Sequence, residues 1–335
     1  MKNLVFTILI CSFFGCGESV SDLIDDVVNE PDRKPIDTSI LGTNAFFNDT
    51  RFGSIGSQAN EVKNTLALNY VRVLFAWNDQ VQPSPNVTPN FSFYDDIASK
   101  VAARDLQMLV VVTGVPSWMS NNANWSIDGN SRKTFAELWL RKVVERYSSN
   151  GRVTAFQIWN EPNMVSDPNN STLGFASNPS NYLELLCYGY SVIKDIAPSK
   201  LVVSAATTAI NQNFPESINY NKDFYTAGAA SCLDVYAVHV YGKQFENFVR
   251  SGGVTDFLNG VARPIWVTES GSQGFDTQLA YGEQMWPYLQ SKIPGIARIY
   301  QYQFVEATSA QTTYGLRNLT PGSELSDLYV SLRDR

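Results

Sequence analysis

The chain has 335 residues, of which 44% are hydrophobic, including 19 Phe, 16 Tyr and 7 Trp, so it can bury one large core or two modest ones. Its 25 Lys and Arg residues are outnumbered by 32 Asp and Glu residues, and no basic cluster stands out. This balance disfavours binding to nucleic acid or anionic membranes, and an acidic, aromatic-rich protein suits a neutral, polar substrate instead.

The first residues have the pattern of a targeting segment. Lys2 precedes the apolar stretch LVFTILICSFFG, which is too short to span a bilayer and has the length typical of a signal peptide. A Cys follows a small residue in FFGCGES, which resembles the lipobox of bacterial lipoproteins. We therefore expect residues 1–15 to be a signal peptide and Cys16 to be lipidated, with an ordinary cleaved signal peptide as the alternative. The expected location is the outer membrane, periplasm or cell surface, or the medium if the protein is secreted.

Residues 16–39 are polar and acidic and contain Pro31 and Pro35, which is typical of a flexible tether. The rest of the chain, 40–335, is then the folded domain. Beyond Cys16, only Cys187 and Cys232 remain. Two cysteines are too few for a disulfide scaffold, and they allow at most one disulfide, whose presence the sequence does not decide.

From residue 40 onward, strand-like and helix-like segments alternate. Eight short runs rich in β-branched and aromatic residues predict strands at 40–47, 69–77, 107–114, 152–160, 200–208, 233–241, 263–270 and 296–304. Between them, apolar residues at helical spacing predict helices at 57–68, 93–105, 132–149, 181–197 and 276–292. This alternation predicts a parallel sheet, and eight repeats match the (β/α)8 TIM barrel. An open, doubly wound sheet is the alternative, but LGTNAFFNDT after the first run lacks the glycine-rich phosphate turn of that fold.

In a barrel, functional groups gather where the strands end, because all strand ends surround one opening. The fourth run ends in Trp159, Asn160 and Glu161, and the seventh ends in Thr268, Glu269 and Ser270. The sixth run carries His239 and Tyr241, which lie two residues apart and therefore on one face of the strand. We expect these groups to meet at one rim.

Two carboxylates at such a rim suit glycoside hydrolysis, which needs one carboxylic acid and one carboxylate. The chain has a single His, so a His-based metal site or a Ser-His-Asp triad is disfavoured, and we expect no metal and no cofactor.

The segments WNEPN and WVTES resemble the signature of glycoside hydrolase clan A, whose members are retaining (β/α)8 enzymes. Within the clan, the chain is most similar to family 39 and its relatives, with family 5 next. The resemblance implies that Glu161 is the acid/base, that Glu269 is the nucleophile and that Asn160 binds the sugar 2-hydroxyl. It also implies that Arg72 lies near the nucleophile and that Tyr241 forms a hydrogen bond with it.

Physical chemistry is consistent with these roles. Arg72 and the Tyr241 hydroxyl would keep Glu269 ionised. An aromatic environment with limited access of water would instead help Glu161 to hold its proton. A retaining pair should have its carboxyl groups about 5 to 5.5 Å apart. Pro162 predicts an extended backbone at Glu161.

Several further side chains are candidates for substrate binding. Trp77, Trp118 and Trp125 could stack on sugar rings, as could Tyr241, whereas core packing is expected for Trp139, Trp266 and Trp286. His239 either lines the sugar site or is a satisfied residue of the barrel. Many clan members have a Trp at the end of strand eight, where this chain reads QYQFVEATS. We expect Gln303, Phe304 or Glu306 to take its place.

The predicted function is therefore that of a monomeric retaining glycoside hydrolase acting on a polysaccharide or oligosaccharide. Endo action on a β-linked glycan is favoured, because little chain follows Gln303 for an accessory domain. The alternatives are a transglycosylase, an exo-acting β-glycosidase and a non-catalytic carbohydrate-binding barrel.

Overall fold

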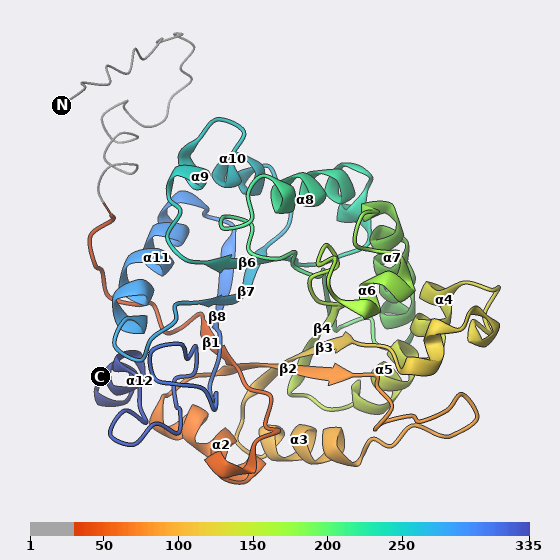
Figure 1. Ribbon diagram of the computed structural model, residues 1–335, viewed down its shortest axis with the longest axis horizontal. Coiled ribbons are helices and arrows are strands. Elements are labelled where there is room, and N and C mark those ends of the chain that lie inside the picture. The colour runs from red at the N-terminus through yellow and green to blue at the C-terminus, as the bar shows by residue number, and fades with distance from the viewer. Residues whose placement is uncertain (1–29) are drawn as a thin grey trace.

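The computed structural model describes residues 30–335, so the expected signal peptide and Cys16 lie outside the described residues. Viewed as in Figure 1, eight parallel strands surround a central axis and the helices lie outside them. The strands are β1 (Leu41–Asn44), β2 (Tyr70–Ala76), β3 (Gln107–Thr113), β4 (Val153–Ile158), β5 (Leu201–Val203), β6 (Tyr236–Tyr241), β7 (Ile265–Gly271) and β8 (Ile296–Gln301). The predicted (β/α)8 barrel is confirmed.

The sheet runs in the order β5-β4-β3-β2-β1-β8-β7-β6. A parallel bridge between Val203 and Val235 joins the two outermost strands and nearly closes the barrel. Each strand lies in its predicted run, except that β7 extends one residue further, to Gly271.

The helices include all five that the sequence predicts, and the last helix of the chain follows β8. They are α2 (Ile55–Asn60), α3 (Ser92–Ala102), α4 (Ser131–Phe135), α5 (Arg141–Tyr147), α6 (Pro168–Leu173), α7 (Pro179–Ile196), α8 (Glu216–Thr226), α9 (Glu246–Val249), α10 (Val254–Asn259), α11 (Gln278–Lys292) and α12 (Asp327–Asp334). A wider π-helical turn at Ala136–Leu140 joins α4 to α5, so the two form the single helix predicted at 132–149. None of the described helices is both long and apolar enough to cross a membrane.

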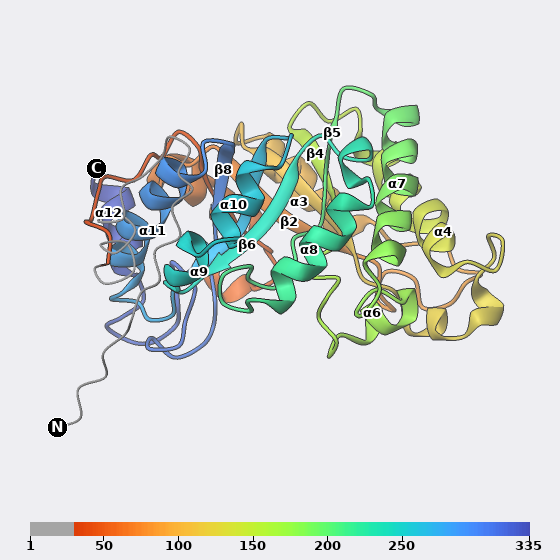
Figure 2. The ribbon, with the colours of Figure 1, turned by 90° about the horizontal axis from the view of Figure 1, so that it is seen from above.

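The barrel interior is apolar at the end where the strands begin. A cluster that includes Leu109, Val203 and Tyr300 fills it. The Arg298 guanidinium lies 3.8 Å from the ring centre of Tyr70 and 4.2 Å from that of Trp266. This packing fills the starting end of the barrel. Polar groups inside the barrel can therefore be reached only from the end where the strands finish, which is the lower edge in Figure 2, near α6 and α9.

Residues 30–39, the last part of the predicted tether, lie against α11. Arg33 pairs with Glu283 at 2.5 Å, and the Lys34 N–H donates to the Glu283 carbonyl at 2.9 Å. Ile36 packs against the core. This described part of the tether is thus attached to the barrel.

The sequence left the pairing of Cys187 and Cys232 open, and the structure joins them in a disulfide. Cys187 lies in α7, and Cys232 follows a 3-10 turn before β6. The bridge therefore links the outer helical layer to the segment that leads into β6.

Candidate active site

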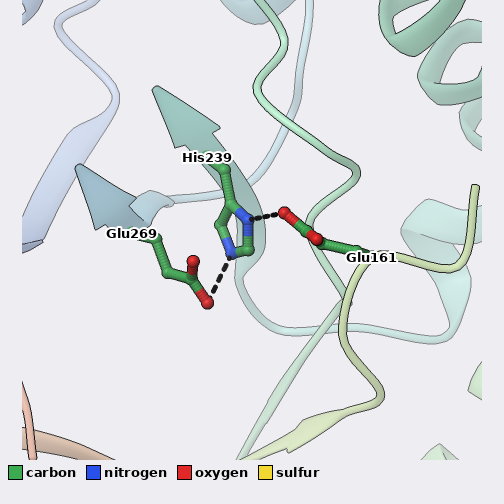
Figure 3. Close-up of side chains that lie close together, drawn as sticks. All are labelled: Glu161, His239 and Glu269. Carbon is green, nitrogen blue, oxygen red and sulfur yellow. Dashed lines mark hydrogen bonds and ion pairs between the residues drawn. The ribbon is translucent and has the colours of Figure 1, made fainter. Parts of the chain in front are cut away.

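Glu161 and Glu269 come together at the rim where the strands end. Glu269 belongs to β7, and Glu161 lies in the loop after β4. One oxygen of each carboxylate and a ring nitrogen of His239, from β6, all lie within 4.8 Å of one another (Figure 3). Residues that are far apart in the sequence thus form one cluster.

Glu269 is the more enclosed of the two carboxylates and is only 7% exposed. Its Oε1 accepts a hydrogen bond from Arg72 Nη1 at 2.6 Å, and its Oε2 accepts one from the Tyr241 hydroxyl at 2.8 Å. Burial alone would raise the pKa of Glu269. Electrostatic interaction with His239 and with Arg72, together with the hydrogen bonds from Tyr241 and Arg72, nevertheless holds that pKa below its usual value. Glu269 is therefore held as an anion.

Arg72 is fully buried at the centre of a hydrogen-bond network. Besides Glu269, its guanidinium donates to Asn44 Oδ1 at 2.6 Å, Gln157 Oε1 at 2.8 Å and Asn160 Oδ1 at 2.6 Å. Asn44 and Gln157 were not among the residues predicted from the sequence, although each is a polar residue within an apolar run. The Asn160 oxygen thus accepts a hydrogen bond from Arg72.

His239 lies between the two carboxylates, as Figure 3 shows. Its Nδ1 is 3.0 Å from Glu161 Oε1, and its Nε2 is 3.5 Å from Glu269 Oε1. The Nδ1 distance is that of a hydrogen bond, whereas the Nε2 atom makes none within residues 30–335. The ring is thus joined to Glu161 and lies close to Glu269 without bonding it.

The backbone at Glu161 is not extended, contrary to the prediction from Pro162. Glu161 has a φ of +43° and Trp159 one of +75°, values that cost about 1–3 kcal/mol each and persist only where other contacts hold them. Here the buried Asn170 holds the loop, because it accepts from the Trp159 indole at 2.8 Å and donates to the Glu161 carbonyl at 2.8 Å. The Glu161 N–H also donates to the Ala206 carbonyl at 2.9 Å. Tertiary contacts therefore override the local preference set by proline.

The prediction that Trp77 stacks on sugar is wrong. Its side chain is fully buried, its indole N–H donates to the Gln82 side chain at 2.8 Å, and its ring stacks on Trp139. Side chains alternate along β2, so the inward direction of Arg72 places Trp77 on the outer face, against the helices.

Trp118 and Trp125 are partly buried and pack against the core. Their indole N–H groups donate to the carbonyls of Gln82 and Met119, each at 2.9 Å. Their contact with substrate stays a prediction.

Tyr302 directly follows β8 and adds an aromatic ring to the three residues expected there, Gln303, Phe304 and Glu306. Phe304 is buried in the core, Gln303 is 7% exposed, and Glu306 accepts a hydrogen bond from the Tyr314 N–H. The Tyr302 ring meets those of Tyr241, Tyr314 and Phe46, with ring centres 6.0, 5.9 and 6.0 Å apart. Burial raises the pKa of Tyr302 first, and the negative charge of Glu269 raises it further. The substrate contact expected of Gln303 stays a prediction.

Glu161, His239 and Glu269 carry donor atoms close enough to share a metal ion. Both oxygens of Glu269, however, already accept hydrogen bonds from Arg72 and Tyr241. A cation there would lie next to a buried guanidinium, so this cluster does not fit a metal centre.

Comparisons with known proteins agree with this geometry. Residues 30–300 match the family model described as Cellulase (glycosyl hydrolase family 5). Among curated proteins, none matches the chain. Similar solved structures include a family 39 glycoside hydrolase from the gut symbiont Bacteroides cellulosilyticus WH2, with 17% identity and a TM-score of 0.64 over 90% of this chain and 63% of that one.

Two further structures have the same fold. A monomeric beta-xylosidase from Caulobacter crescentus CB15 has 14% identity and a TM-score of 0.62, over 91% of this chain and 69% of that one. Endo-glycoceramidase II from Rhodococcus sp. has 15% identity and a TM-score of 0.61, over 90% of this chain and 81% of that one. The chain thus spans less than two thirds of the first of these three structures. The clan expected from the sequence is confirmed, and the matching model is that of the family expected second. The chain belongs to glycosyl hydrolase family 5, the Cellulase family, within the clan A glycosidases.

Proposed function

We propose that the protein is a retaining glycoside hydrolase with Glu269 as nucleophile and Glu161 as acid/base. The observation that carries this proposal is the separation of the two carboxylates, whose nearest oxygens lie within 4.8 Å. Retaining pairs have carboxyl groups about 5 to 5.5 Å apart, whereas inverting pairs need roughly 6.5 to 9.5 Å to admit a water molecule.

In the first step, Glu269 attacks the anomeric carbon while Glu161 gives its proton to the leaving oxygen. In the second step, Glu161 takes a proton from water, and that water releases the sugar from Glu269. The enclosed, hydrogen-bonded position of Glu269 suits an anionic nucleophile. The Glu161 side chain is 16% exposed against 9% for Glu269, which suits a group that exchanges protons with water. Asn160 would donate its side-chain N–H2 to the sugar 2-hydroxyl.

The proposed substrate is a neutral, β-linked polysaccharide or oligosaccharide, cleaved internally by a monomeric enzyme. The similar structures include a β-xylosidase and an endo-glycoceramidase, so their names do not single out one sugar. Transglycosylation and exo action use the same residues and are distinguished by product analysis. The presence of both carboxylates argues against a barrel that only binds carbohydrate.

Two substitutions test the roles. Glu269→Ala should abolish turnover because no nucleophile remains. Glu161→Ala should slow natural substrates far more than aryl glycosides, whose good leaving groups need no proton. Glu216→Ala, an exposed carboxylate on α8, serves as the control.

The anomeric configuration of the first product, followed by NMR, tests the mechanism itself. Retention is expected. Inversion, or full activity of the Glu269→Ala variant on a polysaccharide substrate, would refute the proposal.

Export also remains a proposal. The Cys187–Cys232 disulfide supports it, because such bridges persist mainly outside the cytoplasm. Cys16→Ser should move the protein from the membrane fraction to the soluble fraction if Cys16 is lipidated. An unchanged distribution would favour an ordinary signal peptide.

A further inference from the structure

Helix α8 buries polar side chains where α3 and α7 bury mainly apolar ones. Ser217 and Asn221 lie one turn apart on it, and both are fully buried. Buried polar groups cost free energy unless they are hydrogen-bonded, and an apolar face would pack against the barrel without that cost. The polar face of α8 therefore calls for polar partners, and it has them in the loops that follow β5 and β4.

The loop after β5 receives the first of these contacts. Thr207 and Thr208 in this loop belong to no helix or strand. Asn221 Nδ2 donates to Thr207 Oγ1 at 2.7 Å, and Asn221 Oδ1 accepts from the Tyr236 hydroxyl at 2.5 Å. The Ser217 and Thr208 hydroxyls share a hydrogen bond of 2.8 Å. Side chains from α8 thus hold two successive residues of the loop.

The loop after β5 in turn holds the segment that carries Glu161. The Glu161 N–H donates to the Ala206 carbonyl at 2.9 Å. Two residues further along the chain, Asn163 bonds Thr208 in both directions, because its Oδ1 accepts from the Thr208 N–H and its Nδ2 donates to Thr208 Oγ1, each at 2.9 Å. Asn163 Nδ2 also donates to Ser217 Oγ at 3.2 Å. The Asn163 amide therefore ties the Glu161 segment both to the loop after β5 and to α8.

The contacts of Asn163 differ in kind from those of Asn170. Asn170 belongs to the same loop as Glu161 and bonds its carbonyl, so it supports the local shape of that loop. Asn163 instead fixes the loop against other elements of the barrel, which decides where Glu161 lies relative to His239 on β6. Glu161 has a φ of +43°, a conformation that depends on surrounding contacts to persist.

We infer that Asn163 is a positioning residue for Glu161, supported by the polar face of α8 through Thr208 and Ser217. The inference rests on the proposed function, because it assumes that Glu161 is the acid/base. Both polar atoms of the Asn163 amide are engaged by Thr208 and Ser217, so its role is to hold Glu161 in place and not to touch the reacting atoms. General acid catalysis contributes about 10²–10⁴-fold, and a small displacement of the acid forfeits part of it.

Leaving groups separate positioning from substrate binding. The assay would compare phenyl with 2,4-dinitrophenyl glycosides of cellobiose, xylobiose and mannobiose, all β-linked, using the sugar that the wild type prefers. Phenol needs a proton from Glu161 in order to leave, whereas dinitrophenol does not. Asn163→Ala should lower kcat/KM about tenfold to a hundredfold on the phenyl glycoside and leave the dinitrophenyl glycoside unchanged. Equal losses on both substrates, or no loss on either, would overturn the inference.

Substitutions at Thr208 and Tyr225 supply the matched controls. Thr208→Val removes the hydroxyl that bonds Asn163 and should show the same selective loss, whereas Thr208→Ser keeps that hydroxyl and should restore the wild-type ratio of the two rates. Tyr225 also lies on α8, but its hydroxyl accepts from the Ala262 N–H at 2.8 Å, away from the Glu161 segment. Tyr225→Phe should therefore keep both rates, and a selective loss in this variant would overturn the assignment to Asn163.

A failure of the proposed function would have a different signature, namely that the wild type turns over none of these glycosides. The position of Glu161 can still be followed by NMR of untagged protein, because His239 is the only histidine in the chain and its Nδ1 is 3.0 Å from Glu161 Oε1. Asn163→Ala should shift the Nδ1 signal, as should Thr208→Val if Asn163→Ala does not fold, whereas Tyr225→Phe should leave it in place. An unshifted signal in the folded variant would overturn the positioning role whether or not the protein is a hydrolase.

Discussion

Replacing Tyr241 with Phe removes a single hydroxyl from the candidate active site and keeps the ring. That hydroxyl donates to Glu269 Oε2 at 2.8 Å, and its own pKa is raised well above 10 because burial disfavours the phenolate. It therefore remains a donor across the working pH range. A hydrogen bond to a charged group contributes about 1.5–3 kcal/mol, so Tyr241→Phe should lower the free energy of unfolding by this amount at neutral pH.

The effect should depend on pH in a defined direction. Because the pKa of Glu269 is lower in the folded protein than its usual 4.5, ionised Glu269 contributes stability above that value. This contribution disappears as the pH falls through the lower pKa of the folded state. The stability difference between wild type and Tyr241→Phe should therefore be full at neutral pH and should shrink in acid.

Denaturant unfolding at several pH values measures this difference, and the pH profile of kcat/KM gives an independent reading. If Glu269 must be ionised to attack, its pKa sets the acidic limb of the profile, and Tyr241→Phe should move that limb to higher pH. Tyr314→Phe is the matched control, because its ring meets that of Tyr241 but is not hydrogen-bonded to Glu269. If both variants behaved alike in stability and in the acidic limb, the assignment of Tyr241 would be refuted.

Two further predictions concern residues that support the site or the barrel. Asn170→Ala should cost about 1–3 kcal/mol of stability, because it leaves the Trp159 indole N–H unpaired and removes one of the two hydrogen bonds to the Glu161 carbonyl, and it should lower kcat more than it raises KM. Unchanged kcat in the folded variant would show that Asn170 does not position Glu161. The double variant Cys187→Ser and Cys232→Ser should lower the free energy of unfolding by about 2–4 kcal/mol with unchanged kcat/KM, measured by thermal unfolding and steady-state kinetics. A loss of activity without a loss of stability would contradict a purely structural role for the bridge.

Regular patterns in the sequence were enough to predict the barrel. Each strand is a short apolar run and each long helix carries an apolar stripe, so local chemistry and burial agree along most of the chain. Helix α8 was not predicted, because its buried face includes the polar residues Ser217 and Asn221. The segment that forms α8 therefore lacks the regular apolar pattern by which the other helices were predicted.

The sequence also pointed to Glu161, Glu269 and their neighbours, because polar residues are conspicuous at the ends of apolar runs. Only the tertiary structure brings an oxygen of each within 4.8 Å of the other and places His239 between them. The same applies to Asn170, whose hydrogen bonds hold Glu161 at a positive φ against the preference of the following proline. Local sequence sets what each segment prefers, whereas the distances and directions at the site depend on contacts between segments that meet only when the barrel closes.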